Sequence, residues 1–249
     1  MIPKLTPFHE QQSLYLDFFQ QLGQQGFHGE IDADISNRLV LATDNSIYQV
    51  LPQGAVFPKD INDLITLSQL AAKVNFQSIV LTPRGGGTGT NAQSLTDGIV
   101  VDTSRHMNHV LEINTDECWA RVESGVVKDQ LNAALKPYGL FFAPDLSTSN
   151  RATIGGMINT DASGQGSCVY GKTRDHVLEL TTVLLDGSVM ETRALDAEEE
   201  NAICQGDDRC AQIHNLAVEI QQEHQALIDE VFPPLNRCLT GYDLAHIRD

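Results

Sequence analysis

The chain opens with the periodicity of a helix. Residues 9–25 place Leu14, Phe18 and Leu22 four positions apart, with polar residues between them. Side chains at this spacing lie on one face of a helix, so the pattern predicts a helix that buries one face.

A change of period follows. Short apolar runs at 48–51 and 55–57 predict strands. Asp60 then precedes a helical pattern whose apolar face extends to Val74, and a further apolar run at 78–81 predicts the next strand. Strand, helix and strand at this length predict a βαβ unit, with parallel pairing and a right-handed crossover.

The middle of the chain alternates between strand and turn signals. Runs at 98–102, 109–113 and 118–122 predict three strands, and residues 127–136 predict a short helix that stops before Gly139. These elements indicate a second compact α/β half.

The last third combines a hairpin and a helix. Runs at 177–185 and 188–192 flank Asp186-Gly187, a strong hairpin signal. Residues 194–209 are acidic and turn-like, which predicts an exposed excursion, and 211–230 predict a long amphipathic helix. The whole pattern predicts an α+β fold with two lobes, one a small parallel βαβ lobe and the other a larger mixed or antiparallel sheet flanked by helices.

Charge and cysteine content narrow the functional classes. The 249 residues carry a formal net charge of −17, which argues against a nucleic-acid or anionic membrane surface and is typical of a soluble protein. No apolar stretch reaches the length of a transmembrane helix, and the N-terminus lacks a signal pattern. Five cysteines without a C-x-x-C pair favour reduced thiols, no metal site and a cytoplasmic location, with peripheral association with the inner membrane left open.

A glycine-rich loop follows the strand run at 78–81. Four glycines in five residues cost chain entropy, so such a run serves a backbone purpose, here a concave nest of N–H groups for an anion. A flexible linker is the alternative. The residues of this first loop are Arg84, Gly85, Gly86, Gly87, Thr88, Gly89, Thr90 and Asn91.

Two familiar phosphate loops do not fit the same residues. A Walker loop needs a lysine after its last glycine, whereas the next lysine after Gly89 is Lys128. Residues 87–92 match the G-x-G-x-x-A dinucleotide fingerprint formally, but only five residues separate Ala92 from the strand run at 98. That leaves no room for the helix that the fingerprint must open.

A second loop, at 144–167, is rich in small and hydroxylated residues. This composition lets the backbone approach a flat ligand while hydroxyl and N–H groups satisfy its polar edge. A loop packed only on itself is the alternative, and the presence of two such loops in adjacent lobes makes it weaker.

Together these motifs resemble one family. The PRGGGTGTN of 83–91, the TIGG of 153–156, the Asp-Ala-Ser-Gly of 161–164, Tyr170-Gly171 and the run 175–187 resemble the vanillyl-alcohol-oxidase-type (PCMH-type) FAD-binding domain. Within it, the chain is similar to the N-terminal part of bacterial FAD-linked D-2-hydroxyacid dehydrogenases, of the D-2-hydroxyglutarate and D-lactate type.

The resemblance implies which residues hold FAD. Residues 84–91 would receive the pyrophosphate, and Val177 would meet the adenine through its backbone. The wall beside the pyrophosphate and the flavin would consist of Pro144, Ser149, Thr153, Ile154, Gly155, Gly156, Thr160, Ala162, Ser163 and Gly164. Many relatives have Asn-Ala-Gly-Gly at 161–164, which leaves the role of Asp161 open. Covalent members carry His or Cys near the first loop, where this chain has Thr88, so the implied FAD is dissociable.

The resemblance also implies the chemistry of the whole protein. A D-2-hydroxy acid would transfer hydride to FAD, with catalytic residues in a cap domain beyond Asp249, so none is assigned here. An iron–sulfur cluster is implied only in that C-terminal part, and the electron acceptor stays unassigned. A non-catalytic FAD-carrying subunit that needs a partner chain, and a flavin oxidase or reductase for another substrate class, are the alternatives.

The resemblance and the element order divide the chain into three parts. Residues 1–47 form an N-terminal helical segment, residues 48–105 the first FAD-binding lobe, and residues 106–249 a second lobe that is truncated at its C-terminal end.

Overall fold

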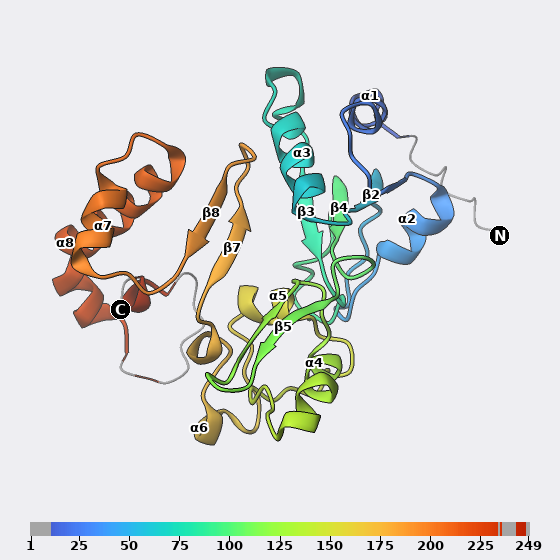
Figure 1. Ribbon diagram of the computed structural model, residues 1–249. Coiled ribbons are helices and arrows are strands. Elements are labelled where there is room, and N and C mark those ends of the chain that lie inside the picture. Colours follow the sequence, from blue (N-terminus) through green and yellow to red (C-terminus); the bar gives the residue numbers. More distant parts are fainter. Residues whose placement is uncertain (1–10, 234, 236–242, 248–249) are drawn as a thin grey trace. The chain divides into compact units, whose positions relative to one another are not determined.

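The computed structural model describes residues 11–233, 235 and 243–247, which belong to two compact units (Figure 1). The first unit comprises residues 1–177 and 183–189, and the second comprises residues 178–182 and 190–249. The α+β class predicted from the sequence is confirmed, because each unit combines strands with helices.

A four-stranded sheet organises the first unit. Its order is β1-β2-β4-β3; β2, β4 and β3 are parallel, and β1 pairs antiparallel with β2. Helix α3 connects β2 to β3, and β4 lies between these two strands, so the parallel βαβ unit is confirmed. The strands are β1 (Glu30–Asp32), β2 (Gly54–Phe57), β3 (Leu81–Arg84) and β4 (Ile99–Asp102).

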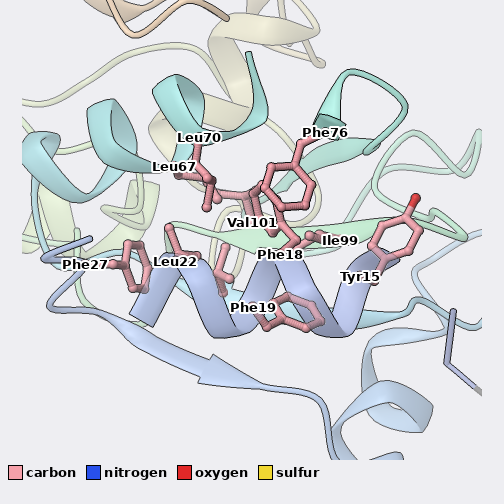
Figure 2. Packing of buried hydrophobic residues seen from close by; sticks show 11 residues of the cluster. Tyr15, Phe18, Phe19, Leu22, Phe27, Leu67, Leu70, Phe76, Ile99 and Val101 are labelled. Carbon is pink, nitrogen blue, oxygen red and sulfur yellow. The ribbon is translucent and has the colours of Figure 1, made fainter. Parts of the chain in front are cut away.

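Helices α1 (Ser13–Gln24) and α3 (Ile61–Ala71) pack on one face of this sheet. Figure 2 shows the resulting core, in which the ring of Phe18 meets that of Phe76 edge to face at 5.2 Å. The predicted cap of α3 is confirmed, because the Asp60 carboxylate accepts hydrogen bonds from two N–H groups of its first turn. The predicted first helix is confirmed from Ser13 on, while residues 9–10 lie outside the described part of the chain.

Residues on the opposite face of the same strands form a second cluster. Ala55, Phe57 and Val100 pack with Leu41 of α2 (Ile35–Leu41). All residues of β2 and β4 are therefore buried, as expected for a parallel sheet covered on both faces.

Three local predictions in this region are wrong. Residues 48–51 form no strand; they contribute only an isolated bridge between Thr43 and Gln49. The third strand begins at Leu81 rather than at residue 78. Val74 is 85% exposed, because α3 ends at Ala71 and a 3-10 turn, Val74–Phe76, instead buries Phe76.

The remainder of the first unit follows the predicted order. Strands β5 (Val110–Asn114) and β6 (Trp119–Val122) pair antiparallel, and α4 (Lys128–Leu135) with the 3-10 turn Lys136–Tyr138 ends at Gly139, whose φ is +72°. Two short helices lie within the second loop and just after it, α5 (Ile154–Asn159) and α6 (Ser167–Tyr170), with a 3-10 turn at Arg174–His176.

Near its end the chain forms a hairpin and two helices. β7 (Leu180–Val183) and β8 (Val189–Thr192) pair around Gly187, whose φ is +84°, so the hairpin is confirmed. The segment 194–209 is largely exposed, as predicted, but its predicted turn-like character is wrong, because it contains α7 (Ala197–Cys204), capped by Asp196. The predicted long helix is α8 (Arg209–Val231), and a 3-10 turn covers Leu244–His246. Within the described ranges no helix is long and apolar enough to cross a membrane.

Candidate functional site

The first loop presents a row of backbone donors. It leaves β3 at Arg84, and Gly87 adopts a φ of +60°, a left-handed conformation that glycine takes without strain. Among the described residues, no protein group accepts a hydrogen bond from the N–H groups of Gly85 to Thr90, and the loop lies at the surface. Six consecutive uncommitted donors are what an anion-binding nest requires.

The Arg84 guanidinium packs against the middle of this loop, because a Cβ added to Gly87 would lie 2.6 Å from its Nη2. Its guanidinium donates to the carbonyl oxygens of Thr43, at 2.8 Å, and Leu41, at 3.4 Å. Burial lowers the pKa of Arg84, and the carboxylates of Asp102 and Asp44 oppose that shift. Arg84 therefore holds the first loop against the end of α2, with its guanidinium next to Gly87.

The second loop packs on the turn between β6 and α4. The Gly155 N–H donates to Ser124 O, and the Ile154 N–H to Val126 O, both at 2.8 Å. The Thr153 side chain is buried and caps α5 by accepting from the Gly156 N–H. The N–H groups of 154–156 are thus already used inside the protein, so this stretch offers a ligand close approach rather than free donors.

The two loops meet directly. A Cβ added to Gly85 would overlap Thr153 Oγ1, and one added to Gly86 would overlap the carbonyl oxygen of Arg151. Glycine is therefore required at both positions for the loops to touch. The alternative of a loop packed only on itself is excluded by these contacts.

The end of the second loop returns to its beginning. A Cβ on Gly164 would overlap the carbonyl oxygen of Asp145, next to the buried Pro144. Ser163 directly precedes Gly164, and its hydroxyl is buried without a hydrogen-bond partner among the described residues. Buried hydroxyls are nearly always hydrogen-bonded, so this oxygen points to a partner that the described residues do not supply.

A pocket of about 270 Å³ opens where the loops meet. Small-molecule sites typically measure about 300–1,000 Å³, so this pocket accommodates only part of a large ligand. Of the predicted site residues, Gly86 and Thr153 line it. The sequence reasoning missed its other walls, which are Ser104, Asn108, Gly125, Val127, Gln130, Asn150 and Arg151.

Arg151 is the cation of this pocket. Its side chain is exposed, and within the described residues it makes no ion pair or hydrogen bond. Its carbonyl oxygen faces Gly86, and Arg151 lines the pocket together with that residue. The signal that could have found it is its position two residues before Thr153, in a loop otherwise free of charge between Asp145 and Asp161.

The other predicted site residues lie around this junction in different ways. Ile154 buries its side chain in the core, while the Thr160 hydroxyl donates to Gly156 O at 3.0 Å. Ser149 accepts from the Asp129 N–H through its carbonyl, and Ala162 accepts from Thr173. Thr88, Gly89, Thr90, Asn91 and Val177 do not line the pocket.

An anionic group at the nest and a flat, narrow group along the small-residue wall would both be accommodated. The free N–H groups, the Arg151 charge and the orphaned Ser163 hydroxyl are the features that FAD would satisfy, since it combines a pyrophosphate with a planar ring. The residues present therefore fit this cofactor.

Comparison with known proteins identifies the same region. A family model described as "FAD binding domain" matches residues 52–193. Two curated relatives are named D-2-hydroxyglutarate dehydrogenase. The one from Pseudomonas putida is 62% identical over 94% of this chain and 23% of its own length, and the one from Escherichia coli is 52% identical over 99% and 24%. The chain spans about a quarter of the length of these relatives.

Solved structures agree on the fold. An alkyldihydroxyacetonephosphate synthase superposes with a TM-score of 0.66 at 23% identity, over 77% of this chain and 41% of that one. A 6-hydroxy-D-nicotine oxidase from Arthrobacter nicotinovorans superposes with a TM-score of 0.59 at 23% identity, over 68% and 36%. At such identities the likeness concerns the fold alone.

Proposed function

Because the chain belongs to the FAD-binding domain family, we propose that its two loops hold FAD non-covalently and that the whole protein oxidises a D-2-hydroxy acid. The observation that carries the proposal is the row of six free N–H groups, Gly85 to Thr90, placed against the second loop.

The first loop would receive the pyrophosphate. A pyrophosphate needs several donors at once, and backbone N–H groups without side chains in the way supply them at close range. Arg151, which lines the pocket with Gly86, would add a second positive charge to that of Arg84 in a strongly acidic chain. Thr88 stands where a covalent flavin would need His or Cys, which supports a dissociable cofactor.

The second loop would form the wall of the ring system. Gly155, Gly156 and Ala162 leave space for a flat group, and the Ser163 hydroxyl lacks a partner that the ring's polar edge would provide. The flavin, when bound, accepts the hydride of the oxidation, while this chain binds and orients it.

For the whole protein, the names of the relatives support a D-2-hydroxyglutarate or closely related D-2-hydroxy acid as substrate. The residues that would bind its carboxylates and take its proton belong to the three quarters of the relatives that this chain does not match. Within the described part of the chain the cysteines at 118, 168, 204 and 210 form no disulfide, which supports a cytoplasmic location, whereas Cys238 lies outside the described residues.

Thermal unfolding with added flavins tests the cofactor. FAD should raise the melting temperature of the purified chain with concentration, by an amount equivalent to about 2.7 kcal/mol at 100 times its Kd. FMN should stabilise less, because it lacks the AMP half. Acid precipitation should release all of the flavin into the supernatant. Equal shifts with FAD and FMN, or none with either, would contradict the proposal.

The substrate is tested on the full-length protein that contains this chain. Under anaerobic conditions, D-2-hydroxyglutarate should bleach the flavin absorbance, and L-2-hydroxyglutarate should not. Bleaching by neither enantiomer would refute the substrate class while leaving the FAD site intact.

A further inference from the structure

Helix α5 ends in a turn that determines where the backbone of residues 162–164 runs, the segment proposed to lie beside the flavin. The Asp161 N–H donates to Ile158 O at 3.1 Å, and the Ala162 N–H donates to Met157 O at 2.9 Å. This pair of hydrogen bonds is the Schellman arrangement, which needs a left-handed residue after the helix, usually glycine. Here that residue is Asp161, with a φ of +41°.

A buried lysine holds this aspartate. Lys172 Nζ lies 2.9 Å from Asp161 Oδ2, and the side chain of Lys172 is only 6% exposed. Asp161 Oδ1 also accepts from the Arg174 N–H at 3.1 Å, and Arg174 Nε lies 3.9 Å from Oδ2. One carboxylate is therefore bound by a buried ammonium group and a backbone donor at once.

Thr173, which lies between Lys172 and Arg174 in the sequence, holds Ala162, the residue after Asp161. Thr173, fully buried, donates to the carbonyl oxygen of Ala162 from its hydroxyl at 2.7 Å and from its N–H at 3.2 Å. Residues 172–174 thus bind Asp161 and Ala162 just before Ser163 and Gly164, and Gly164 packs against Asp145 at the start of the second loop.

The ion pair between Lys172 and Asp161 is better explained by a role in positioning the backbone than by a contribution to the stability of the fold. A buried ion pair adds little net stability compared with apolar residues of the same shape, but loss of one partner leaves a buried charge uncompensated. Asp is also one of the few non-glycine residues that enter the left-handed region, because its short polar side chain can be bound locally. Lys172 therefore stabilises the left-handed conformation of Asp161, and that conformation keeps the Asp161 carboxylate within reach of Lys172.

We propose that Lys172 is a positioning residue for the FAD site: through its ion pair with Asp161 it fixes the left-handed turn that places Ala162, Ser163 and Gly164 along the cofactor. This inference rests on the proposed function. Lys172 itself contacts no ligand, and its effect on FAD passes through the carboxylate of Asp161.

A double-mutant cycle with a FAD-binding readout tests it. Four proteins are compared: wild type, Lys172→Met, Asp161→Asn and the double variant. Binding of FAD is followed by quenching of flavin fluorescence well below the melting temperature, and the melting temperature is measured without FAD. Lys172→Met should weaken FAD binding about tenfold, since it leaves the partly buried Asp161 carboxylate with only the more distant Arg174 guanidinium, 3.9 Å away, as a cation. The double variant, in which Asn keeps the left-handed turn without a charge, should bind FAD within about threefold of wild type.

The outcomes distinguish a failure of the proposed FAD binding from a failure of the proposed role of Lys172. A wild-type chain that does not bind FAD refutes the proposed function. Wild type and Lys172→Met with equal affinity refute the role of Lys172, even where the melting temperature falls, because the pair then serves the fold alone. A double variant as weak as the weaker single variant also refutes it. If Lys172→Met does not fold, Asp161→Asn carries the same expectation from the other side of the pair. Lys136→Met, which removes an exposed lysine from the same unit, should leave FAD binding unchanged.

Discussion

The two loops of the candidate site are built in opposite ways. The first loop leaves the N–H groups of Gly85 to Thr90 without protein acceptors and is fixed from outside, by the Arg84 guanidinium at its base and by the Asn45 N–H, which donates to Gly87 O at 3.1 Å. The second loop uses most of its own donors, and buried lysines pair with carboxylates near both its ends, Lys128 with Asp145 at 4.0 Å and Lys172 with Asp161 at 2.9 Å.

The difference assigns different tasks to the two loops. Free donors in the first loop gain their full interaction energy only when an anion arrives, so this loop supplies binding. A loop whose polar groups are already satisfied gains little from a ligand but keeps its shape without one, so the second loop supplies a preformed wall. FAD affinity should therefore depend on steric changes in the first loop, and on the loss of single polar atoms in the second loop.

The largest effect should come from Gly86→Ala. The added methyl group would overlap the carbonyl oxygen of Arg151, a backbone atom that cannot rotate away, so the loops must separate. FAD affinity should fall by at least about 100-fold, equivalent to about 2.7 kcal/mol. Fluorescence titration measures it.

Gly23→Ala is the matched control for that change. Its added Cβ would have only Ile31 Cδ1 nearby, at 3.9 Å, and alanine favours the helix in which it lies. This variant should bind FAD as wild type does. Gly86→Ala with wild-type affinity would show that the contact between the loops is dispensable.

A smaller loss of FAD affinity should distinguish Arg151 from Arg84, the two arginines that border the first loop. Arg151→Met should weaken FAD binding about tenfold, since hydrogen bonds to charged groups contribute about 1.5–3 kcal/mol, and should leave the melting temperature without FAD unchanged because Arg151 is exposed. Arg84→Met should instead lower that melting temperature, because it leaves the Thr43 and Leu41 carbonyls without their donor.

Salt dependence distinguishes the two arginine variants further. Binding through Arg151 weakens as salt screens its charge, so Arg151→Met should reduce the salt dependence of the FAD dissociation constant, and Arg84→Met should not. A reduced salt dependence in Arg84→Met instead would mean that the Arg84 guanidinium, which lies next to Gly87, binds the ligand.

The sequence predicted what depends on local pattern. The parallel βαβ unit, the Asp60 cap and the hairpin at Gly187 follow from periodicity and from turn residues, and all are present. Both loops were found for the same reason, because glycine and small residues are informative by themselves.

What the sequence could not predict depends on partners distant in the chain. The position of the Arg84 guanidinium is decided by the carbonyl groups of Leu41 and Thr43, some forty residues earlier. The use of the Gly155 N–H by Ser124, and the pairing of Asp161 with Lys172, likewise require the folded contacts. At 194–209, acidic residues suggested an irregular segment, but Asp196 and Glu199 form a capping box that starts a helix.

The smallest effect, and the finest test of the comparison, concerns Ser163. Its hydroxyl is buried without a partner among the described residues, and keeping such a group unsatisfied costs about 1–3 kcal/mol. Ser163→Ala removes that cost, so the melting temperature without FAD should rise slightly. FAD affinity should nevertheless fall by about threefold, because a hydroxyl that the ligand would satisfy is gone. The exposed Ser147, changed to Ala, should alter neither quantity. A higher melting temperature together with a weaker FAD affinity would show that the Ser163 hydroxyl serves the ligand rather than the fold. If melting temperature and FAD affinity both rise, Ser163 contacts only protein, and the second loop makes no polar contact with FAD at this residue.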